Sequence, residues 1–417
     1  MLDLTLIRRD PDGVRAALAR RDAETAGRLD DLLALDATWR DATAAAERIR
    51  AEQKAASEAI AGAKRSGDDA AEAIARMRDV SSQVKALTER ARRAEEELQG
   101  VLVTLPNLPA QTAPADDEVV REVGHAGATG ADHLELAGDM IDMERGARLS
   151  GSRFAYLRGT LVMLEFALVR WALEKLAGHG FEPVVPPVLV REQALYGTGF
   201  LPDTEQQIYR LADDDLYLAG TSEVALASLH AGESVDRLPL RYAGFSSCFR
   251  REAGAAGKDT RGIFRVHQFD KVEMFSFVEP AFSRDEHERL LAIEEEILQE
   301  LRLPYRVVNI GIAELGASAA KKYDCEAWLP GQGRYREVTS TSNTTDFQAR
   351  RLQIRYRPVD GARPEVVHTL NGTAVAVGRT IIALLENGQR EDGSVELPGV
   401  LAPYGAPPSL QAARAAR

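Results

Sequence analysis

The chain has 417 residues, a hydrophobic content of 45% and a formal net charge of −12. Its length allows two or more domains, and its acidic balance argues against a protein that coats nucleic acid non-specifically. The N-terminal stretch is not that of a signal peptide, no apolar run is long enough to span a membrane, and the two cysteines, Cys248 and Cys325, form neither a disulfide framework nor a CxxC metal pattern. These features predict a cytoplasmic protein without a membrane segment.

Residues 1–105 carry two runs of mostly apolar residues at spacings of three and four, the pattern of a coiled-coil seam. A polar, glycine-containing break at 63–69 separates the runs. Two helices that fold back as an antiparallel hairpin would bury both seams, whereas the alternative is a dimerisation coil. The first run is Leu32, Leu35, Trp39, Ala42, Ala46, Ile49, Gln53, Ala56 and Ile60, and the second is Val80, Val84, Leu87, Ala91, Ala94, Leu98 and Val101.

A proline-punctuated linker, LPNLPAQTAP at 105–114, follows. From about residue 118 the pattern changes to a mixture of helical and strand-like segments, which predicts a mixed α/β domain. No GxxxxGK[ST] occurs and no GxGxxG follows a strand, so a nucleotide would bind without a P-loop or a Rossmann turn. The helical segments are 161–178 and 284–301, and the strand-like ones are 184–185, 216–218, 272–278, 305–308 and 366–370.

The segment FRREAGAAGKDTRGIFRVHQFDKVE, residues 249–273, is densely charged yet begins and ends like a β-strand. We interpret it as a strand–loop–strand hairpin with a mobile loop. Strand periodicity would give it a face made of Arg250, Glu252, Arg265, Phe269 and Glu273. Such a face does not form a hydrophobic core, because buried unpaired charges are costly. It suits a charged, planar ligand, and the alternative is a solvated hairpin with surface salt bridges.

This pattern resembles motif 2 of the class II aminoacyl-tRNA synthetases, in the form found in seryl-tRNA synthetases. GFEPVVPPVLV (180–190), with its central Pro186, is similar to motif 1, and TLNGTAVAVGRTIIALLENGQ (369–389) is similar to motif 3. GTSEV (220–224) and REVTSTSNTTDFQARR (336–351) also resemble stretches of the seryl-specific enzymes, and the N-terminal hairpin resembles their tRNA-binding arm. The resemblance covers the chain up to about residue 403.

The resemblance implies that ATP and L-serine form seryl-adenylate, and that the seryl group then moves to the 3′ end of tRNA(Ser) and, by family, tRNA(Sec). Such catalysis needs positioning and charge neutralisation at the α-phosphorus, not a covalent nucleophile. Arg250 and Arg379 would be catalytic, and Glu337 and Ser340 would hold Mg²⁺. Glu252 would read the adenine amine and Phe269 would stack on the ring. The implied ATP-binding residues are Arg250, Arg251, Glu252, Val266, Phe269, Glu337, Val338, Thr339, Ser340 and Arg379.

The implied serine-binding residues are Thr221, Ser222, Glu223, Glu273 and Thr373. Glu223 would pair with the ammonium group, and Glu273 and Thr373 would reach the hydroxyl. A site that bonds a hydroxyl rejects alanine strongly, because its polar groups would otherwise be left unpaired. We interpret His267 as a structural residue and Cys248 as a buried small hydrophobe, and no zinc is expected.

The fold expected is α+β, with an N-terminal antiparallel coiled-coil hairpin and a class II catalytic domain built on an antiparallel sheet flanked by helices. The expected parts are an arm at 1–105, a linker and lead-in at 106–132, a catalytic domain at 133–403 and a flexible tail at 404–417. The expected assembly is a homodimer through residues 165–190. The candidate tRNA contacts are basic residues of the arm, namely Arg48, Arg50, Lys54, Lys64, Arg65, Arg76, Arg78 and Lys85.

Three other functions compete with a housekeeping synthetase. A ligase that loads a carrier protein would lack the long arm, and a non-canonical RNA-binding or regulatory paralogue would have lost Arg250, Glu252, Glu337 or Arg379. An active duplicate that serves an antibiotic biosynthesis or resistance pathway would keep all of these features, so the residues alone leave that alternative open.

Overall fold

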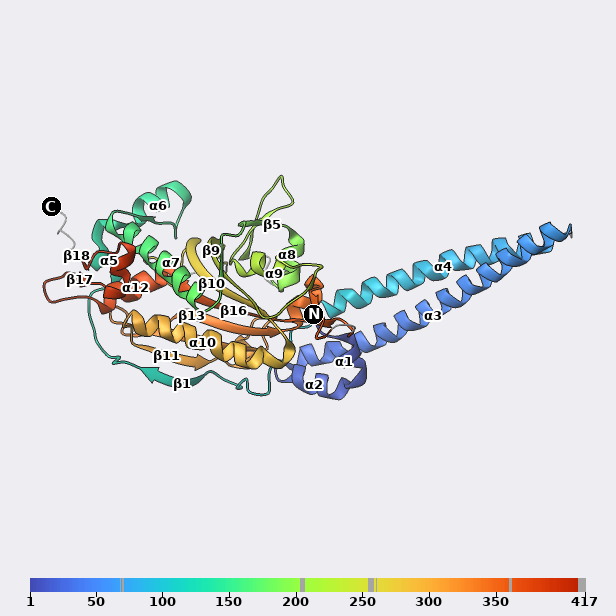
Figure 1. Ribbon diagram of the computed structural model, residues 1–417, viewed down its shortest axis with the longest axis horizontal. Helices are drawn as coiled ribbons and strands as arrows, with labels where there is room; N and C mark the ends of the chain where they lie inside the picture. The colour runs from blue at the N-terminus through green and yellow to red at the C-terminus, as the bar shows by residue number, and fades with distance from the viewer. Residues whose placement is uncertain are drawn as a thin grey trace. The chain divides into compact units, whose positions relative to one another are not determined.

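The computed structural model describes residues 1–67, 69, 71–202, 207–253, 259, 261–359 and 362–411. The chain divides into two compact units, Leu2–Pro106 and Asn107–Arg417 with Met1, and each is described by itself (Figure 1). None of the helices in the described ranges combines the length and the hydrophobicity that crossing a membrane requires.

The first unit contains α1 (Leu4–Arg9), α2 (Pro11–Ala19), α3 (Ala23–Ser66) and α4 (Ala71–Leu102). The Asp22 carboxylate caps α3 by accepting from the Thr25 amide at 2.6 Å, which satisfies an otherwise free donor at the helix start. Gly67, at φ 78°, ends the helix in the left-handed region that glycine adopts without steric cost. Helices α3 and α4 then run back along each other as the hairpin that the two apolar runs predict (Figure 1).

Two hydrogen bonds give the direction of pairing in the hairpin. Arg50 Nη2 donates to Thr88 Oγ1 at 3.1 Å, and Gln53 Nε2 donates to Ser81 Oγ at 3.1 Å. A later position on α3 therefore meets an earlier position on α4, as in an antiparallel pair. Every residue of the two predicted runs is buried or half-buried, which confirms the seam and the antiparallel hairpin.

The second unit is organised around an eight-stranded sheet of order β1-β11-β12-β13-β16-β10-β9-β4. All neighbours are antiparallel except β4 and β9, so the predicted class II type of sheet is confirmed. The strands are β1 (Glu118–Val123), β4 (Glu182–Val184), β9 (Leu240–Phe249), β10 (Gln268–Val278), β11 (Tyr305–Asn309), β12 (Lys321–Leu329), β13 (Arg334–Thr345) and β16 (His368–Ala376).

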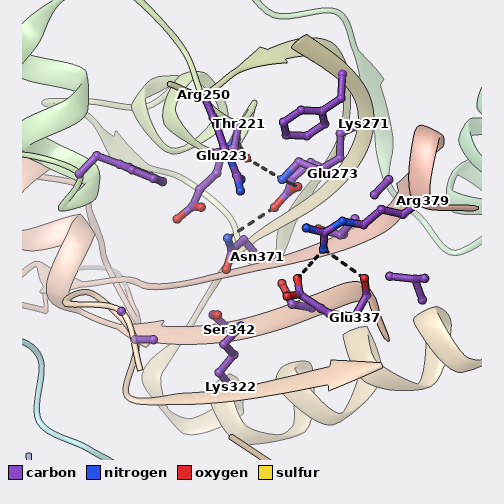
Figure 2. Close-up of a pocket in the computed structure, with 18 of the residues that line it drawn as sticks. Thr221, Glu223, Arg250, Lys271, Glu273, Lys322, Glu337, Ser342, Asn371 and Arg379 are labelled. Atoms are coloured by element: carbon purple, nitrogen blue, oxygen red, sulfur yellow. Dashed lines mark hydrogen bonds and ion pairs between the residues drawn. The ribbon is translucent and has the colours of Figure 1, made fainter. Parts of the chain in front are cut away.

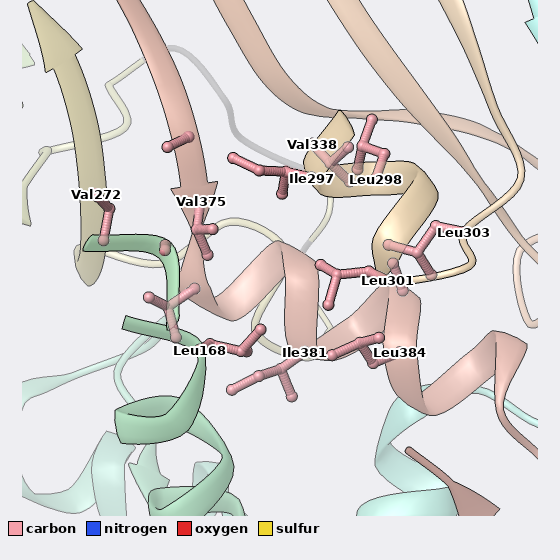
Figure 3. Close-up of a cluster of buried hydrophobic side chains, with 14 of the residues drawn as sticks. Leu168, Val272, Ile297, Leu298, Leu301, Leu303, Val338, Val375, Ile381 and Leu384 are labelled. Atoms are coloured by element: carbon pink, nitrogen blue, oxygen red, sulfur yellow. The ribbon is translucent and has the colours of Figure 1, made fainter. Parts of the chain in front are cut away.

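Three helices pack against one face of this sheet: α7 (Thr160–Gly178), α10 (Ser283–Glu300) and α12 (Val377–Asn387). Figure 3 shows Leu168 of α7, Ile297 of α10 and Ile381 of α12 gathered around Val272 and Val375 of the sheet. Side chains alternate along each strand, so the residues next to Val272 on β10, Lys271 and Glu273, project to the other face. The apolar layer thus fixes which polar side chains face the cavity described below.

Shorter elements complete the unit. The remaining helices are α5 (His133–Ala137), α6 (Met143–Ser150), α8 (Glu192–Thr198), α9 (Glu223–Ser228) and α11 (Phe347–Leu352), with 3₁₀ turns η1 (Gly138–Met140), η3 (Pro280–Phe282), η4 (Ile312–Glu314) and η5 (Gly399–Tyr404). The remaining strands are β2 (Ile141–Asp142), β3 (Tyr156–Leu157), β5 (Leu189–Val190), β6 (Tyr209–Arg210), β7 (Tyr217–Leu218), β8 (Ser234–Val235), β14 (Arg355–Tyr356), β15 (Glu365–Val366), β17 (Val395–Glu396) and β18 (Ser409–Leu410).

The charged segment 249–273 forms the predicted hairpin, since β9 and β10 pair from Phe249–Gln268 inward. The predicted mobile loop lies partly outside the described residues, at 254–258 and 260. One detail of the prediction is wrong: Arg250 and Glu252 do not lie on a strand, and neither does Arg265, which precedes the start of β10 at Gln268. Strand β9 ends at Phe249, and Glu252 adopts a φ of 48°, a turn conformation that breaks the alternation on which the prediction relied.

Two boundary expectations also differ from the structure. The stretch 106–132 is more than a linker and lead-in, because β1 within it forms an edge of the main sheet beside β11. The expected flexible tail at 404–417 is wrong for its described part, since β18 pairs with β17 and Leu410 is 2% exposed in the core. Ala406 and Leu410 both pack in the core and Tyr404 packs against it, contacts that sequence periodicity does not detect in so short a segment.

Candidate active site

A cavity of about 600 Å³ lies on the sheet face that α7, α10 and α12 leave uncovered. Its walls come from β10, β13 and β16, from the segments that flank the β9–β10 loop, and from the beginnings of α9 and α12. It brings together most of the serine-binding and ATP-binding residues expected from the sequence. Those that line it are Thr221, Glu223, Arg250, Glu252, Val266, Phe269, Glu273, Glu337, Val338, Ser340, Thr373 and Arg379.

Three of the expected residues do not line the cavity. Ser222 is buried at 1% exposure and is not among the residues that line the cavity. Arg251 is exposed, and its backbone amide donates to the Gln207 carbonyl at 2.9 Å. The Thr339 hydroxyl donates to Glu294 Oε2 at 3.1 Å on the helical side of the sheet. Ser340 next to Thr339 does face the cavity, as alternation along β13 requires.

One end of the cavity, the arginine end, is formed by Arg379, Glu337, Ser340 and Lys322. Arg379 Nη1 lies 3.1 Å from Glu337 Oε1 and donates to the Glu337 carbonyl at 3.1 Å (Figure 2). The Phe264 ring supports this arginine from 4.6 Å below its guanidinium carbon, a cation–π contact. The guanidinium is therefore held in place before any ligand arrives.

The charge of Glu337 depends on the arginine end. Burial alone would raise the pKa of Glu337, but the positive charges of Arg379, Lys322 and Arg250 outweigh it and hold that pKa below its ordinary value. Asp324, opposite Ser340 in the β12–β13 register, has the reverse balance: burial and then the negative charge of Glu337 raise its pKa to about 7. The two carboxylates thus repel each other, although Lys322 Nζ lies 2.8 Å from Asp324 Oδ1.

The other end, the carboxylate end, is formed by Thr221, Glu223, Lys271, Glu273, Asn371 and Thr373. Lys271 Nζ donates to Thr221 Oγ1 at 2.8 Å and is ion-paired with Glu273 Oε2. Asn371 Nδ2 donates to Glu273 Oε1 at 3.4 Å, as Figure 2 shows. Glu273 lies opposite Thr373 in the β10–β16 register, so the two side chains expected to meet a substrate hydroxyl are neighbours.

Both glutamates of the carboxylate end are buried and have raised pKa values. Burial, followed by the charge of Glu273, raises the pKa of Glu223 to about 7, and Gln348 Nε2 donates to Glu223 Oε1 at 2.7 Å. Burial also raises the pKa of Glu273, while the charge of Lys271 acts in the opposite direction. Such a pair of glutamates suits a ligand that carries an ammonium group and a hydroxyl.

Arg250 lies between the two ends, because its charge acts on Glu223 and Glu273 as well as on Glu337. Its Nε donates to the Gly220 carbonyl at 3.1 Å, and its guanidinium carbon is 5.3 Å from the Phe269 ring centre. Glu252 is engaged with Arg265, whose Nη1 is 2.5 Å from Glu252 Oε2. This places a cation, an aromatic ring and a carboxylate acceptor side by side, as the ligand surface predicted from 249–273 requires.

Two residues outside the cavity agree with their sequence-based interpretation. His267 Nδ1 bonds to the Arg250 carbonyl at 2.9 Å and its ring lies 5.2 Å from that of Phe154, so it holds the hairpin end in shape. Cys248 is 0% exposed, and burial raises the pKa of its thiol. The burial of Cys248 confirms its interpretation as a buried small residue, and the structural role of His267 stays a prediction.

Several residues of the cavity were not expected from the sequence, and Lys271 and Asn371 are the most important of them. A signal for both was present. Lys271 lies midway between Phe269 and Glu273 on one strand, so the alternation that groups those two residues includes it. Asn371 lies two residues before Thr373 on β16, so the same alternation places these two side chains on one face. Lys322 had no such signal, because the strand that carries it, β12, was not predicted.

The basic residues expected to contact tRNA are all exposed on the hairpin. Arg48, Arg50, Lys54, Lys64 and Arg65 lie on α3, and Arg76, Arg78 and Lys85 lie on α4. None of them is needed to bury the seam.

Comparisons with known proteins agree with this site. Residues 1–109 match the family model of the seryl-tRNA synthetase N-terminal domain, and residues 207–388 match that of the tRNA synthetase class II core domain (G, H, P, S and T). The chain is 50% identical to the serine–tRNA ligase of Streptomyces coelicolor and 50% identical to that of Thermobifida fusca, over 97% of this chain and 97% of each relative.

Solved structures of high similarity extend over almost the whole chain. Seryl-tRNA synthetase from Pyrococcus horikoshii, complexed with ATP, matches with a TM-score of 0.93 at 40% identity and covers 99% of this chain and 100% of that one. Cytoplasmic serine–tRNA ligase from Naegleria fowleri, in complex with AMP, matches with a TM-score of 0.86 at 32% identity over 99% of both chains. The chain therefore belongs to the seryl-tRNA synthetase family of class II aminoacyl-tRNA synthetases.

Proposed function

We propose that this chain is a serine–tRNA ligase, which activates L-serine with ATP and transfers the seryl group to the 3′ end of tRNA(Ser) and, by family, tRNA(Sec). The observation that carries the proposal is the single cavity that joins a carboxylate end to an arginine end, with Arg250 between them. The carboxylate end suits the ammonium and hydroxyl groups of the amino acid, and the arginine end suits the triphosphate of ATP. The reaction joins the amino acid to the α-phosphate between the two ends, beside Arg250.

The residues of the cavity accomplish activation by position and charge. Glu223 pairs with the serine ammonium group, and Glu273 and Thr373 bond the hydroxyl. Arg250 holds the serine carboxylate against the α-phosphate and neutralises charge that develops there, while Arg379 holds the γ-phosphate. Phe269 stacks on the adenine and Glu252 accepts from its amine. The reacting carboxylate and phosphorus are thereby held together, and a covalent enzyme intermediate is unnecessary.

The arginine end also fits Mg²⁺, with Glu337 and Ser340 as the residues that would hold it. Their carboxylate and hydroxyl oxygens are ligands that this cation prefers. The pKa of Asp324 is raised by burial and then by repulsion from Glu337, and this repulsion is a second reason, because a divalent cation relieves it. When bound there, the ion supplies charge neutralisation for the ATP phosphates.

The arm and the surface near α7 supply the remaining parts of the proposal. The exposed basic residues of α3 and α4 contact the backbone of a serine tRNA, which the arm reads by shape. The chain forms a homodimer through residues 165–190, a region that leaves two large apolar side chains exposed, Phe166 at 60% and Val185 at 79%, which the partner subunit would cover. We place the enzyme in the cytoplasm, where its two free cysteines stay reduced.

The competing functions are not favoured. The relatives that align with this chain over 97% of their own length are named serine–tRNA ligases. Arg250, Glu252, Glu337 and Arg379 are all present and line one cavity, whereas an RNA-binding or regulatory paralogue has no need of them. A duplicate serving an antibiotic pathway would catalyse the same reaction.

The proposal is tested by ATP–pyrophosphate exchange with each of the twenty amino acids, followed by charging of serine tRNA. We expect exchange that depends on serine and a charged tRNA product. Exchange that depends on a different amino acid would refute the assignment of the carboxylate end. Serine-dependent exchange without tRNA charging would refute the assignment of the arm.

A further inference from the structure

Lys271 is the one cation of the carboxylate end, and the resemblance implies no role for it. It lies on β10 with 8% of its side chain exposed, and its ammonium reaches two groups expected to contact serine. Nζ donates to Thr221 Oγ1 at 2.8 Å and forms an ion pair with Glu273 Oε2 (Figure 2). A lysine this deeply buried is retained only with partners for its charge, and both partners are binding groups of the proposed site.

The charge of Glu273 depends on this lysine. The groups that act on Glu273 are Lys271 on the same strand, Arg250 after β9, Asn371 on β16, Glu223 at the start of α9, and Glu294 of α10 beneath the sheet. Glu223 and Glu294 are acids, and burial alone favours the neutral form of Glu273. Lys271 is the cation in direct contact, so it is the group best placed to keep Glu273 ionised.

The protonation state of Glu273 decides what this end of the cavity selects. An ionised carboxylate only accepts hydrogen bonds, whereas a protonated one also donates. With Asn371 donating to its Oε1 and Lys271 paired with its Oε2, a charged Glu273 is an acceptor with a fixed direction beside Thr373. A substrate hydroxyl donates to such an acceptor strongly. A methyl group leaves a desolvated charge unpaired, which is the basis of strong discrimination.

We propose that Lys271 is a specificity-determining positioning residue, whose ammonium, bonded to Thr221 and paired with Glu273, holds the Glu273 carboxylate as a charged acceptor for the substrate hydroxyl. The inference rests on the proposed serine–tRNA ligase function and deepens it. Lys271 acts through Glu273 and takes no part in the reaction at phosphorus. Recognition of the substrate hydroxyl therefore depends on the charge of Lys271, a residue that does not itself contact the hydroxyl.

The test is Lys271→Met, which keeps the length of the side chain and removes its charge. Serine-dependent and alanine-dependent pyrophosphate exchange are measured with the full chain from pH 6 to 9. We expect the KM for serine to rise roughly 10- to 100-fold, the size of one lost charged hydrogen bond, and the preference for serine over alanine to fall by a similar factor. The acid limb of kcat/KM should move to higher pH, because loss of the lysine charge raises the pKa of Glu273. Lys271→Arg, which keeps the charge, should retain the wild-type limb.

Lys322→Met is the matched control, since Lys322 is a second lysine of the cavity and pairs with Asp324 at the arginine end. We expect it to raise the KM for ATP and to leave the preference for serine over alanine at the wild-type value. A purely structural loss in Lys271→Met would lower kcat and move neither the pH limb nor this preference, and that result would overturn the proposal.

Lys271→Met leaves a buried carboxylate without its cation, so the double variant Lys271→Met/Glu273→Gln serves if the single variant does not fold. It removes both charges, so we expect an acid limb that reports only the remaining acid Glu223 and a lost preference for serine. A double variant with the wild-type preference would overturn the inference. Wild-type exchange with serine is scored first, so a failure of the proposed function is distinguished from a failure of the role of Lys271.

Discussion

Single side chains in the cavity owe their charge state to neighbours that are distant in sequence. Glu337 is ionised because Arg379 and Lys322 face it, whereas Glu223, buried beside a second glutamate, has a pKa of about 7. Motif spacing identifies which residues are present but not what surrounds each of them. Replacing one of these side chains should therefore change the kinetics of activation or its dependence on pH.

Replacing either catalytic arginine should abolish activation without unfolding the chain. Arg250→Ala and Arg379→Ala each remove a guanidinium that meets phosphate charge, and comparable donors contribute about 3–4 kcal/mol to the transition state, or roughly a 10²- to 10³-fold loss in kcat. Serine-dependent pyrophosphate exchange measures this loss, with melting temperature as the folding check. Arg357→Ala, on an exposed residue outside the cavity, is the control. Wild-type exchange in Arg250→Ala or Arg379→Ala would remove that residue from the site.

The buried acids should make the unliganded protein less stable as the pH rises. Glu223 and Asp324 have pKa values of about 7 in the folded chain, raised from 4.5 and 3.8. Between the lower and the higher value the folded state binds more protons than the unfolded state, so the free energy of unfolding falls with rising pH. Melting temperatures from pH 5 to 8 measure the decline. Glu223→Gln should reduce its slope, and an unchanged slope would show that Glu223 is not a buried acid of raised pKa.

The elements differ in how they are stabilised. The hairpin of α3 and α4 buries one seam, with many alanines and half-buried positions such as Gln53, Ala56 and Ile60. The main sheet instead has an apolar layer from three helices on one face and polar cavity residues on the other. The stability of an element with a thin core depends on its few large buried side chains.

Truncating a large seam residue should loosen the arm and leave the catalytic unit intact. Leu98 of α4 is 1% exposed, and Leu→Ala changes at such positions cost about 2–5 kcal/mol. We expect Leu98→Ala to lower the temperature at which helical circular dichroism is lost and to reduce tRNA charging at elevated temperature. Pyrophosphate exchange should not change. The exposed neighbour Glu97→Ala is the control, and equal melting of the two variants would contradict the seam.

The whole molecule combines a unit that carries the cavity with a unit that carries basic residues and no cavity residue. Deleting residues 31–100 and closing the gap with a short glycine linker should leave serine-dependent exchange nearly intact. It should abolish tRNA charging at physiological RNA concentration, because the phosphate contacts of the arm are lost. In the intact enzyme, tRNA binding should weaken steeply as salt rises. Near-normal charging by the shortened enzyme would mean that the hairpin has only a structural role.

The proposed homodimer can be tested by mass. Light scattering at micromolar concentration should give about 2 × 45.5 = 91 kDa. Phe166→Asp with Val185→Asp places charges at two exposed apolar positions of the proposed interface and should shift the mass toward the monomer, because burying unpaired charge is costly. Val359→Asp, at 67% exposure outside this region, should leave the mass unchanged. A wild-type monomer would refute the dimer.

Features that depend on local pattern could be predicted from the residues alone. The three-and-four spacing of Leu32 to Ile60 predicts a seam because helical periodicity is local, and the order Arg250, Glu252, Glu337, Arg379 predicts a class II site because each motif is a short, contiguous stretch. Alternation along β10 also contained the signal for Lys271, which the sequence analysis overlooked.

Contacts between segments that are distant in the sequence became known only from the tertiary structure. The turn at Glu252, the pairing of β18 with β17, the exclusion of Arg251 from the cavity and the raised pKa of Glu223 all depend on neighbours supplied by other elements. The ion pair between Lys271 and Glu273 is local, but its burial between Thr221 and Asn371 is not. Burial strengthens the electrostatic interactions of these charged groups. Burial is a property of packing, which the order of the residues alone does not specify.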